Sequence, residues 1–178
     1  EILIGLVGSE MCIRDRVCTS KDADPDSIFR YVEFPERVNY VGRLDKDSTG
    51  LLLLTNDGDL ANEIQRSRNN HEKEYHVRVN TDITEDFIKK MSEGVEILDT
   101  VTKPCKVKKT GTRNFSIILT QGLNRQIRRM CDALHVRVVH LKRVRIMNIR
   151  LGSLRPGEFR TLTRGEEQEL RRLVQKRS

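Results

Sequence analysis

Short apolar segments separated by turn residues recur along the chain and predict several strands. The run LLLLTN at residues 51–56 has the length of a strand and lies between turn residues, which indicates a fully buried strand. The segment EKEYHVRVN at residues 72–80 alternates polar and apolar positions, as a strand with one buried face does. Residues 105–122 predict two strands joined at Thr-Gly-Thr, and two further strand-like runs follow through Leu151.

Helices are predicted where an N-cap residue precedes apolar residues at helical spacing. Asp24, Asp57 and Thr84 are the candidate N-caps of the first three helices. The expected helices cover residues 22–32, 57–67, 83–95, 124–135 and 166–177. Helices mixed with consecutive strand pairs indicate an α+β domain, built on a largely antiparallel mixed sheet with flanking helices.

Length and composition allow one domain with a substantial core. The chain has 178 residues, of which 37% are hydrophobic and 33% charged, and it contains no apolar run long enough to cross a bilayer. The four cysteines never occur at C-x-x-C spacing and have no paired histidines nearby, so neither a zinc site nor a disulfide framework is indicated.

Positive charge is concentrated in the last third of the chain. Residues 121–178 hold fifteen Lys and Arg against five Asp and Glu, whereas residues 17–120 have a net charge of −2. This asymmetry favours a nucleic-acid partner, because a phosphate backbone requires a basic surface. A membrane surface is less favoured, since the basic residues are interleaved with strand-like segments rather than gathered on one amphipathic helix.

Residues 1–16, EILIGLVGSEMCIRDR, place their positive charges after the apolar stretch, which is the reverse of the order in a signal peptide. Read back into codons, Leu6 to Arg16 matches a DNA string that resembles a transposon-type sequencing-library adaptor. We therefore predict that residues 1–16 are an adaptor artefact and not native, and we leave them out of the fold prediction. The natural chain is expected to begin near Val17, cut from a longer parent.

The segment GRLDKDSTGLLLLTNDGD, residues 42–59, holds four aspartates around a leucine run. Its DKDSTG portion resembles the start of an EF-hand calcium loop, but the twelfth position is Asn56 instead of a bidentate Glu, and leucines occupy positions seven to ten. Asp47, Asp57 and Asp59 have turn-forming neighbours and are interpreted as turn and cap residues. Asp45 differs, because it lies at the mouth of a loop that enters the predicted buried strand.

Three segments together resemble one enzyme family. Residues 42–59 resemble the catalytic motif of pseudouridine synthases, in the branch of the RsuA and the RluB, RluE and RluF-type ribosomal RNA enzymes. EKEYHVRV resembles the tyrosine-bearing strand of that family, and GLNRQIRRMCDAL resembles its basic motif. With LKRVRIMNIRLGSLRPGEFRTLT included, the similarity covers residues 17–173, and HEKEYHV and PCKVKK favour the RluF type, which acts on 23S ribosomal RNA.

The resemblance implies a bacterial-type isomerase that converts a specific uridine of ribosomal RNA to pseudouridine without a metal or cofactor. Asp45 corresponds to the nucleophile, which attacks the ribose or assists loss of the base so that uracil reattaches through carbon. Tyr75 would stack on the extruded uracil, and Arg128 would pair with the Asp45 carboxylate. A carboxylate in a dry pocket tends to protonate, and a fixed guanidinium keeps it ionised.

The remaining expectations concern the contacts of the protein with RNA and an alternative function. Arg43 would fill the gap left when the nucleotide flips out, and Arg125 and Arg129 would contact the RNA backbone. The implied protein is a cytoplasmic monomer that acts on ribosomal RNA, with transfer RNA as an open second substrate. The alternative is a non-catalytic RNA-binding protein, against which stand a carboxylate at the centre of the site and an aromatic content of 4%, low for a base-stacking platform.

The sequence departs from the family at both ends. An S4-like RNA-binding domain and a Lys-Pro-x-Gly turn, which usually precede the segment matching VCTS, are missing, as is a basic C-terminal tail. We therefore expect residues 17–178 to form a catalytic domain whose sheet is incomplete at one edge.

Overall fold

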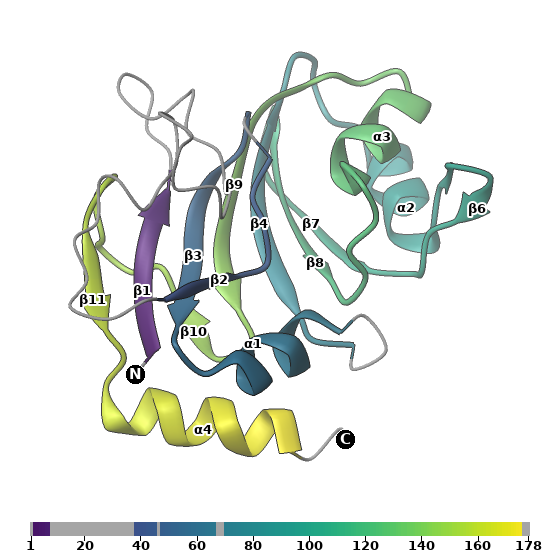
Figure 1. The fold of residues 1–178 in the computed structure, drawn as a ribbon. Coiled ribbons are helices and arrows are strands. Elements are labelled where there is room, and N and C mark those ends of the chain that lie inside the picture. The colour runs from purple at the N-terminus through teal and green to yellow at the C-terminus, as the bar shows by residue number, and fades with distance from the viewer. Residues whose placement is uncertain (1, 8–37, 46, 67–69, 176–178) are drawn as a thin grey trace, which may run out of the picture.

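The computed structural model describes residues 2–7, 38–45, 47–66 and 70–175, which form one main sheet with helices packed against it (Figure 1). Neighbouring strands follow the order β11-β1-β3-β9-β4-β8-β7, with β2 paired to β3 and β10 paired to β9. The strands of this sheet are β1 (Ile2–Val7), β2 (Asn39–Val41), β3 (Thr49–Thr55), β4 (Lys73–Val79), β7 (Lys106–Gly111), β8 (Asn114–Leu119), β9 (Val138–Ile146), β10 (Ile149–Arg150) and β11 (Phe159–Thr161). Among the strand pairs of the described residues, β3 and β9 run parallel and the others are antiparallel, which confirms the predicted α+β class.

Four helices and a small second sheet complete the described part of the chain. The helices are α1 (Gly58–Gln65), α2 (Glu85–Glu93), α3 (Gln126–Ala133) and α4 (Arg164–Gln175), and β5 (Glu96–Ile97) pairs with β6 (Thr100–Val101). Two predicted N-caps are confirmed, because the Asp57 side chain accepts a hydrogen bond from Leu60 N at 3.0 Å and Thr84 Oγ1 accepts one from Phe87 N at 3.1 Å. The helix expected at residues 22–32 lies outside the described residues.

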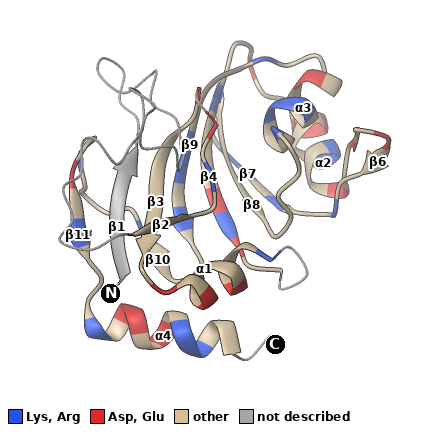
Figure 2. Ribbon diagram, in the orientation of Figure 1, with Lys and Arg blue, Asp and Glu red and all other residues tan. Residues whose placement is uncertain are grey.

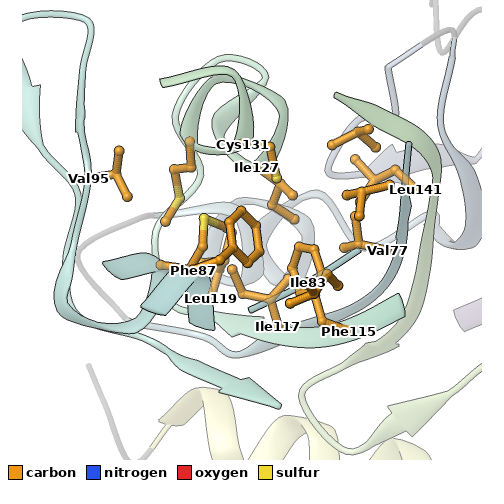
Figure 3. Packing of buried hydrophobic residues seen from close by; sticks show 14 of the residues in the cluster. Val77, Ile83, Phe87, Val95, Phe115, Ile117, Leu119, Ile127, Cys131 and Leu141 are labelled. Atoms are coloured by element: carbon orange, nitrogen blue, oxygen red, sulfur yellow. The ribbon is translucent and has the colours of Figure 1, made fainter. Parts of the chain in front are cut away.

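Two apolar cores lie on either side of the parallel β3–β9 pair along the sheet. The first joins β2, β3 and α1 to the C-terminal segment, and its members include Val41, Leu51, Leu53, Ile64, Ile149 and Leu170. The second joins β4, β8 and β9 to α2 and α3, with Phe87 and Phe115 in an edge-to-face contact at a centroid distance of 5.6 Å (Figure 3). A pocket between the two cores is therefore lined by residues of elements that pack into one core or the other.

The segment Ile2–Val7, which the fold prediction left out, forms a strand of the main sheet. Strand β1 pairs with β3, Leu3 being in register with Leu54, and with β11, Leu3 being in register with Thr161. Sequence periodicity could not assign this pairing, because backbone groups of any sequence can form such a ladder. The adaptor origin of residues 1–16 stays a prediction.

Two of the four cysteines lie in the described part of the chain, Cys105 being half-buried and Cys131 buried. Cys105 and Cys131 are free thiols, and burial raises the pKa of Cys131 to about 12. In the described ranges, no helix is both long and apolar enough to span a membrane.

Candidate active site

A pocket of about 430 Å³ opens between the two cores. Its walls come from the loop after β2, from α1, β4 and β9, and from the loop that leads into α3. Asp45, Tyr75, Arg43 and Arg125 all line it, so the structure brings together four of the six residues singled out from sequence. Pockets between packed units are the common location of small-molecule and nucleotide sites.

The buried guanidinium of Arg143 binds the loop that carries Asp45. Arg143 on β9 is only 2% exposed, and its Nε donates to the carbonyl oxygen of Leu51 at 2.8 Å. Its two terminal nitrogens donate to the carbonyl oxygens of Arg43 at 3.2 Å and of Gly42 at 3.4 Å. Five donors in a rigid plane allow one arginine to satisfy several carbonyls at once. Arg143 thus ties the loop to β3 and β9 together.

Gly50 allows this close approach of loop, strand and guanidinium. It has φ of +115°, and a Cβ atom at this position would lie 2.2 Å from the backbone oxygen of Arg143. Residues 49 and 50 form the parallel register with residues 142 and 143. The glycine that ends the DKDSTG stretch is therefore explained by backbone contact between β3 and β9, and a residue with a side chain does not fit there.

The strongest ion pairs of the site involve Asp47 rather than Asp45. Arg125 forms a bidentate pair with the Asp47 carboxylate, at 2.9 and 2.7 Å, and its Nη1 lies 4.0 Å from Asp45 Oδ2. Arg128 Nε lies 3.2 Å from Asp47 Oδ2, and its Nη2 donates to the Asp47 carbonyl oxygen at 2.6 Å. The hydrogen bonds from Arg125 lower the pKa of Asp47, and burial lowers the pKa of Arg128.

The expected pairing of Arg128 with the Asp45 carboxylate is therefore not what this structure has. The physical reason is the turn in which the Asp45 carbonyl accepts from Ser48 N at 2.9 Å, and in which both the backbone and the side chain of Asp47 contact the Arg128 guanidinium. Asp47, which we interpreted from sequence as a turn residue, is also the carboxylate that contacts both Arg125 and Arg128.

Tyr75 lines the pocket from β4. Lys73, two residues earlier, lines the same pocket, and burial together with the charge of Arg143 lowers its pKa. Arg43 is exposed at the rim. Arg129 instead lies against Asn124, donating to its carbonyl oxygen and its side-chain oxygen at 3.1 Å each, and does not line the pocket.

The loop before α3 presents Arg125 in an unusual conformation. Arg125 is the N-cap of α3 and has φ of +47°, in the left-handed region that a non-glycine residue rarely adopts. Buried Gln126 supports the loop, because its Oε1 accepts from Leu123 N at 3.0 Å. A backbone held in this region costs on the order of 1 kcal/mol and persists where surrounding contacts require it.

Three site residues were missed from sequence: Asp47, Lys73 and Arg143. Lys73 had a usable signal, since it shares a strand face with Tyr75. Asp47 and Arg143 had none, because their partners lie far away along the chain. No group of three or more His, Cys, Asp or Glu in the described part of the chain is arranged to hold a metal ion.

Comparison with known proteins identifies the family. Residues 17–133 match the RNA pseudouridylate synthase family. The chain belongs to this family. It is 52% identical over 162 residues to the dual-specificity RNA pseudouridine synthase RluF of Escherichia coli, which covers 91% of this chain and 56% of that protein. It is 34% identical over 150 residues to the ribosomal large subunit pseudouridine synthase B of Bacillus subtilis, covering 81% of this chain and 62% of that protein.

A solved structure agrees with this assignment. A crystal structure of a pseudouridylate synthase superposes with a TM-score of 0.85 at 29% identity and covers 97% of this chain and 73% of that one. The chain spans a little over half the length of the RluF proteins that it matches.

Proposed function

We propose that this chain isomerises a uridine of ribosomal RNA, most closely in the manner of RluF-type enzymes, with 23S RNA as the substrate. The observation that carries the proposal is a half-exposed carboxylate, Asp45, in one pocket with Tyr75 and Arg125. Support for the RNA class comes from the names of the relatives, which describe pseudouridine synthases of RNA and of the large ribosomal subunit. The protein would act as a cytoplasmic monomer, with transfer RNA as a second substrate class to be tested.

Asp45 would act as the nucleophile, attacking the ribose or assisting departure of the base. The bond between the uracil nitrogen and the ribose breaks, uracil turns, and its carbon forms the new bond to the ribose, which releases any bond between Asp45 and the ribose. The proton on that carbon leaves, and the freed ring nitrogen takes up a proton. Tyr75 would stack on the extruded ring, and Arg43 at the rim would occupy the space that the flipped nucleotide vacates.

The cationic side chains would have unequal roles. Arg125, whose Nη1 is 4.0 Å from Asp45 Oδ2, is better placed than Arg128 to act on the nucleophile directly. Arg128 would act through Asp47, by fixing the turn that presents Asp45. RNA phosphates would compete for Arg125, because half-exposed ion pairs are weak and screened by salt.

Replacing Asp45 by Asn tests the proposal. The substitution keeps the size and hydrogen bonding of the side chain and removes the ionised oxygen, so RNA binding should persist and turnover should fall by several orders of magnitude. The measurement is tritium release from ribosomal RNA that carries 5-tritiated uridine. A rate above about a tenth of the parent value would exclude Asp45 as nucleophile.

The same assay distinguishes an enzyme from the alternative, a non-catalytic RNA-binding protein. A chain that binds RNA but releases no tritium in its unmodified form would be a non-catalytic RNA-binding protein. Activity that disappears with excess chelator would contradict metal-independent catalysis.

A further inference from the structure

The sheet has a second chemical face, opposite the catalytic pocket. On β4 the side chains alternate, so that Tyr75 and Val77 lie toward the pocket and the second core, while His76 and Arg78 lie on the other side and are exposed. Exposed cationic side chains of β7 and β9 lie beside them in register. We name this surface the basic sheet face; it consists of His76, Arg78, Lys108, His140 and Lys142.

Cross-strand register places cations directly opposite one another on this face. His76 faces Lys142, and Arg78 faces His140, across the β4–β9 ladder. Lys108 extends the row across β8, because both it and His76 are in register with Ser116. This register gathers basic side chains of β4 and β9 in one row, so an anion lying across the row would meet several of them at once.

Some other arginines of this molecule are paired with carboxylates. Arg160 pairs with Glu166, and Arg171 pairs with Asp57, in both cases within 3.0 Å. Within the described ranges, Arg78, Lys108 and Lys142 have no such carboxylate partner. On α4, acidic and basic segments lie side by side (Figure 2). The basic sheet face thus differs from an ordinary solvated surface of mixed charge.

A hollow of about 350 Å³ lies within this face. Its polar walls are His76, Arg78, His140 and Lys142, together with the neutral groups of Thr110 and Asn114. An arginine fork, an ammonium and neutral hydrogen-bond donors around one hollow match the oxygens of a phosphate. A negatively charged peptide would satisfy the charges equally, but a chain of regularly spaced phosphates better matches cations that recur across three strands.

We propose that the basic sheet face binds the phosphate backbone of a second RNA segment, separate from the one that enters the catalytic pocket. The proposal rests on the proposed function, because it assumes an RNA substrate. It requires that the substrate be large enough to reach both faces of the sheet. A long ribosomal RNA can do so, whereas a short stem-loop bound at the pocket cannot.

The test compares long and short RNA. In the triple variant Arg78→Gln, Lys108→Gln, Lys142→Gln, the dissociation constant for a full-length large-subunit ribosomal RNA transcript should rise at least about tenfold. The slope of its logarithm against the logarithm of salt concentration should fall by about 0.7 to 0.9 for each lost contact. Affinity and tritium release with the short stem-loop that contains the modified uridine should stay within about twofold of the parent.

The matched control removes the same number of positive charges elsewhere. Lys89→Gln, Lys90→Gln, Arg172→Gln alters exposed side chains of α2 and α4, so equal losses in the two variants would overturn the proposal as an effect of net charge. Unchanged affinity of the first variant for the long transcript would also overturn it and would leave an acidic protein as the partner to seek. Failure of the unmodified chain to act on either RNA would instead count against the proposed function.

Discussion

Arg143 connects three backbone segments that meet beneath the candidate nucleophile. Its guanidinium donates to the carbonyls of Gly42, Arg43 and Leu51, and the side chain is almost completely buried. A buried charge held by carbonyl oxygens alone is costly unless every donor is well placed. Arg143 therefore acts as a positioning residue, through the loop that carries Asp45.

Replacing Arg143 by Lys should keep the positive charge and remove the planar guanidinium, whose three nitrogens each donate to a different carbonyl. One ammonium cannot reach all three carbonyls, so the loop should shift, and a displacement of about 1 Å can reduce kcat roughly 100-fold. KM for RNA should change little, because the pocket rim remains. Tritium release measured over a range of RNA concentrations gives kcat and KM separately and tests this prediction. Thermal unfolding checks that the variant folds. An unchanged kcat would show that the loop holds its position without the guanidinium.

Asp47 provides a second prediction at the residue scale. In Asp47→Asn the bidentate pair with Arg125 is weakened and the carbonyl contact to Arg128 is retained. We expect kcat to fall about tenfold, which corresponds to about 1.4 kcal/mol, far less than for Asp45→Asn. Equal losses in the two variants would contradict the assignment of Asp45 as the sole nucleophile.

At the scale of elements, the crossing of β3 and β9 depends on the missing side chain of Gly50. Gly50→Ala would place its Cβ 2.2 Å from the Arg143 backbone oxygen at a positive φ, so we expect loss of several kcal/mol or failure to fold. Gly58→Ala is the matched control, because nothing lies within 4 Å of its Cβ position, and it should be neutral or slightly stabilising. Thermal unfolding of both variants tests this. Similar melting temperatures would refute the steric explanation.

The junction between β11 and α4 has a pH-dependent contact. Arg160 donates to both carboxylate oxygens of Glu166 at 2.8 and 2.7 Å, and this pair lowers the pKa of Glu166 from 4.5 to about 2. Stability from this contact is complete above the unfolded pKa and is lost as pH falls from about 4.5 to about 2.

Glu166→Gln should remove that contribution. Because Arg160 is 37% exposed, we discount the pair to about 1 kcal/mol, or roughly 2–4 °C in melting temperature at neutral pH. The difference between parent and variant should shrink toward pH 2. A difference that grows on acidification would have the wrong sign and would assign the effect to another group.

At the scale of the whole molecule, local sequence patterns predicted helices and strands. They did not predict the contacts between residues that lie far apart along the chain. Asp57 and Thr84 marked helix starts because capping involves only neighbouring residues. Motif resemblance named Asp45, Tyr75 and Arg128 as the catalytic set; Asp45 and Tyr75 share a pocket, whereas Arg128 does not line it and contacts Asp47 instead. The contact of Asp47 with both arginines depends on packing α3 against the β2–β3 loop, which no period in the sequence encodes.

The adaptor origin of residues 1–16 has a direct test. If the prediction is correct, amplifying the locus again from source DNA should give different codons before Val17, including a Lys-Pro turn. Recovery of the same residues from an independent library would refute it. In either case we predict that the sheet requires a strand between β3 and β11, because β1 completes the backbone pairing of both.

Removing residues 1–7 measures that requirement. Strand β3 would lose a partner along its whole length, Ile2 to Val7 being in register with Thr55 to Gly50, and the apolar stretch Leu51–Leu54 would border an open edge. Unpaired apolar edges promote association between chains. We expect the melting temperature to fall by at least about 4 °C and aggregation to increase, since a loss of about 2–3 kcal/mol shifts it by about 2–4 °C per kcal/mol. Replacing the segment by an unrelated strand-forming heptapeptide should restore most of the loss, because the contribution lies in backbone pairing. A truncated chain that melts at the same temperature as the untruncated chain would show that β1 adds nothing to the stability of the sheet.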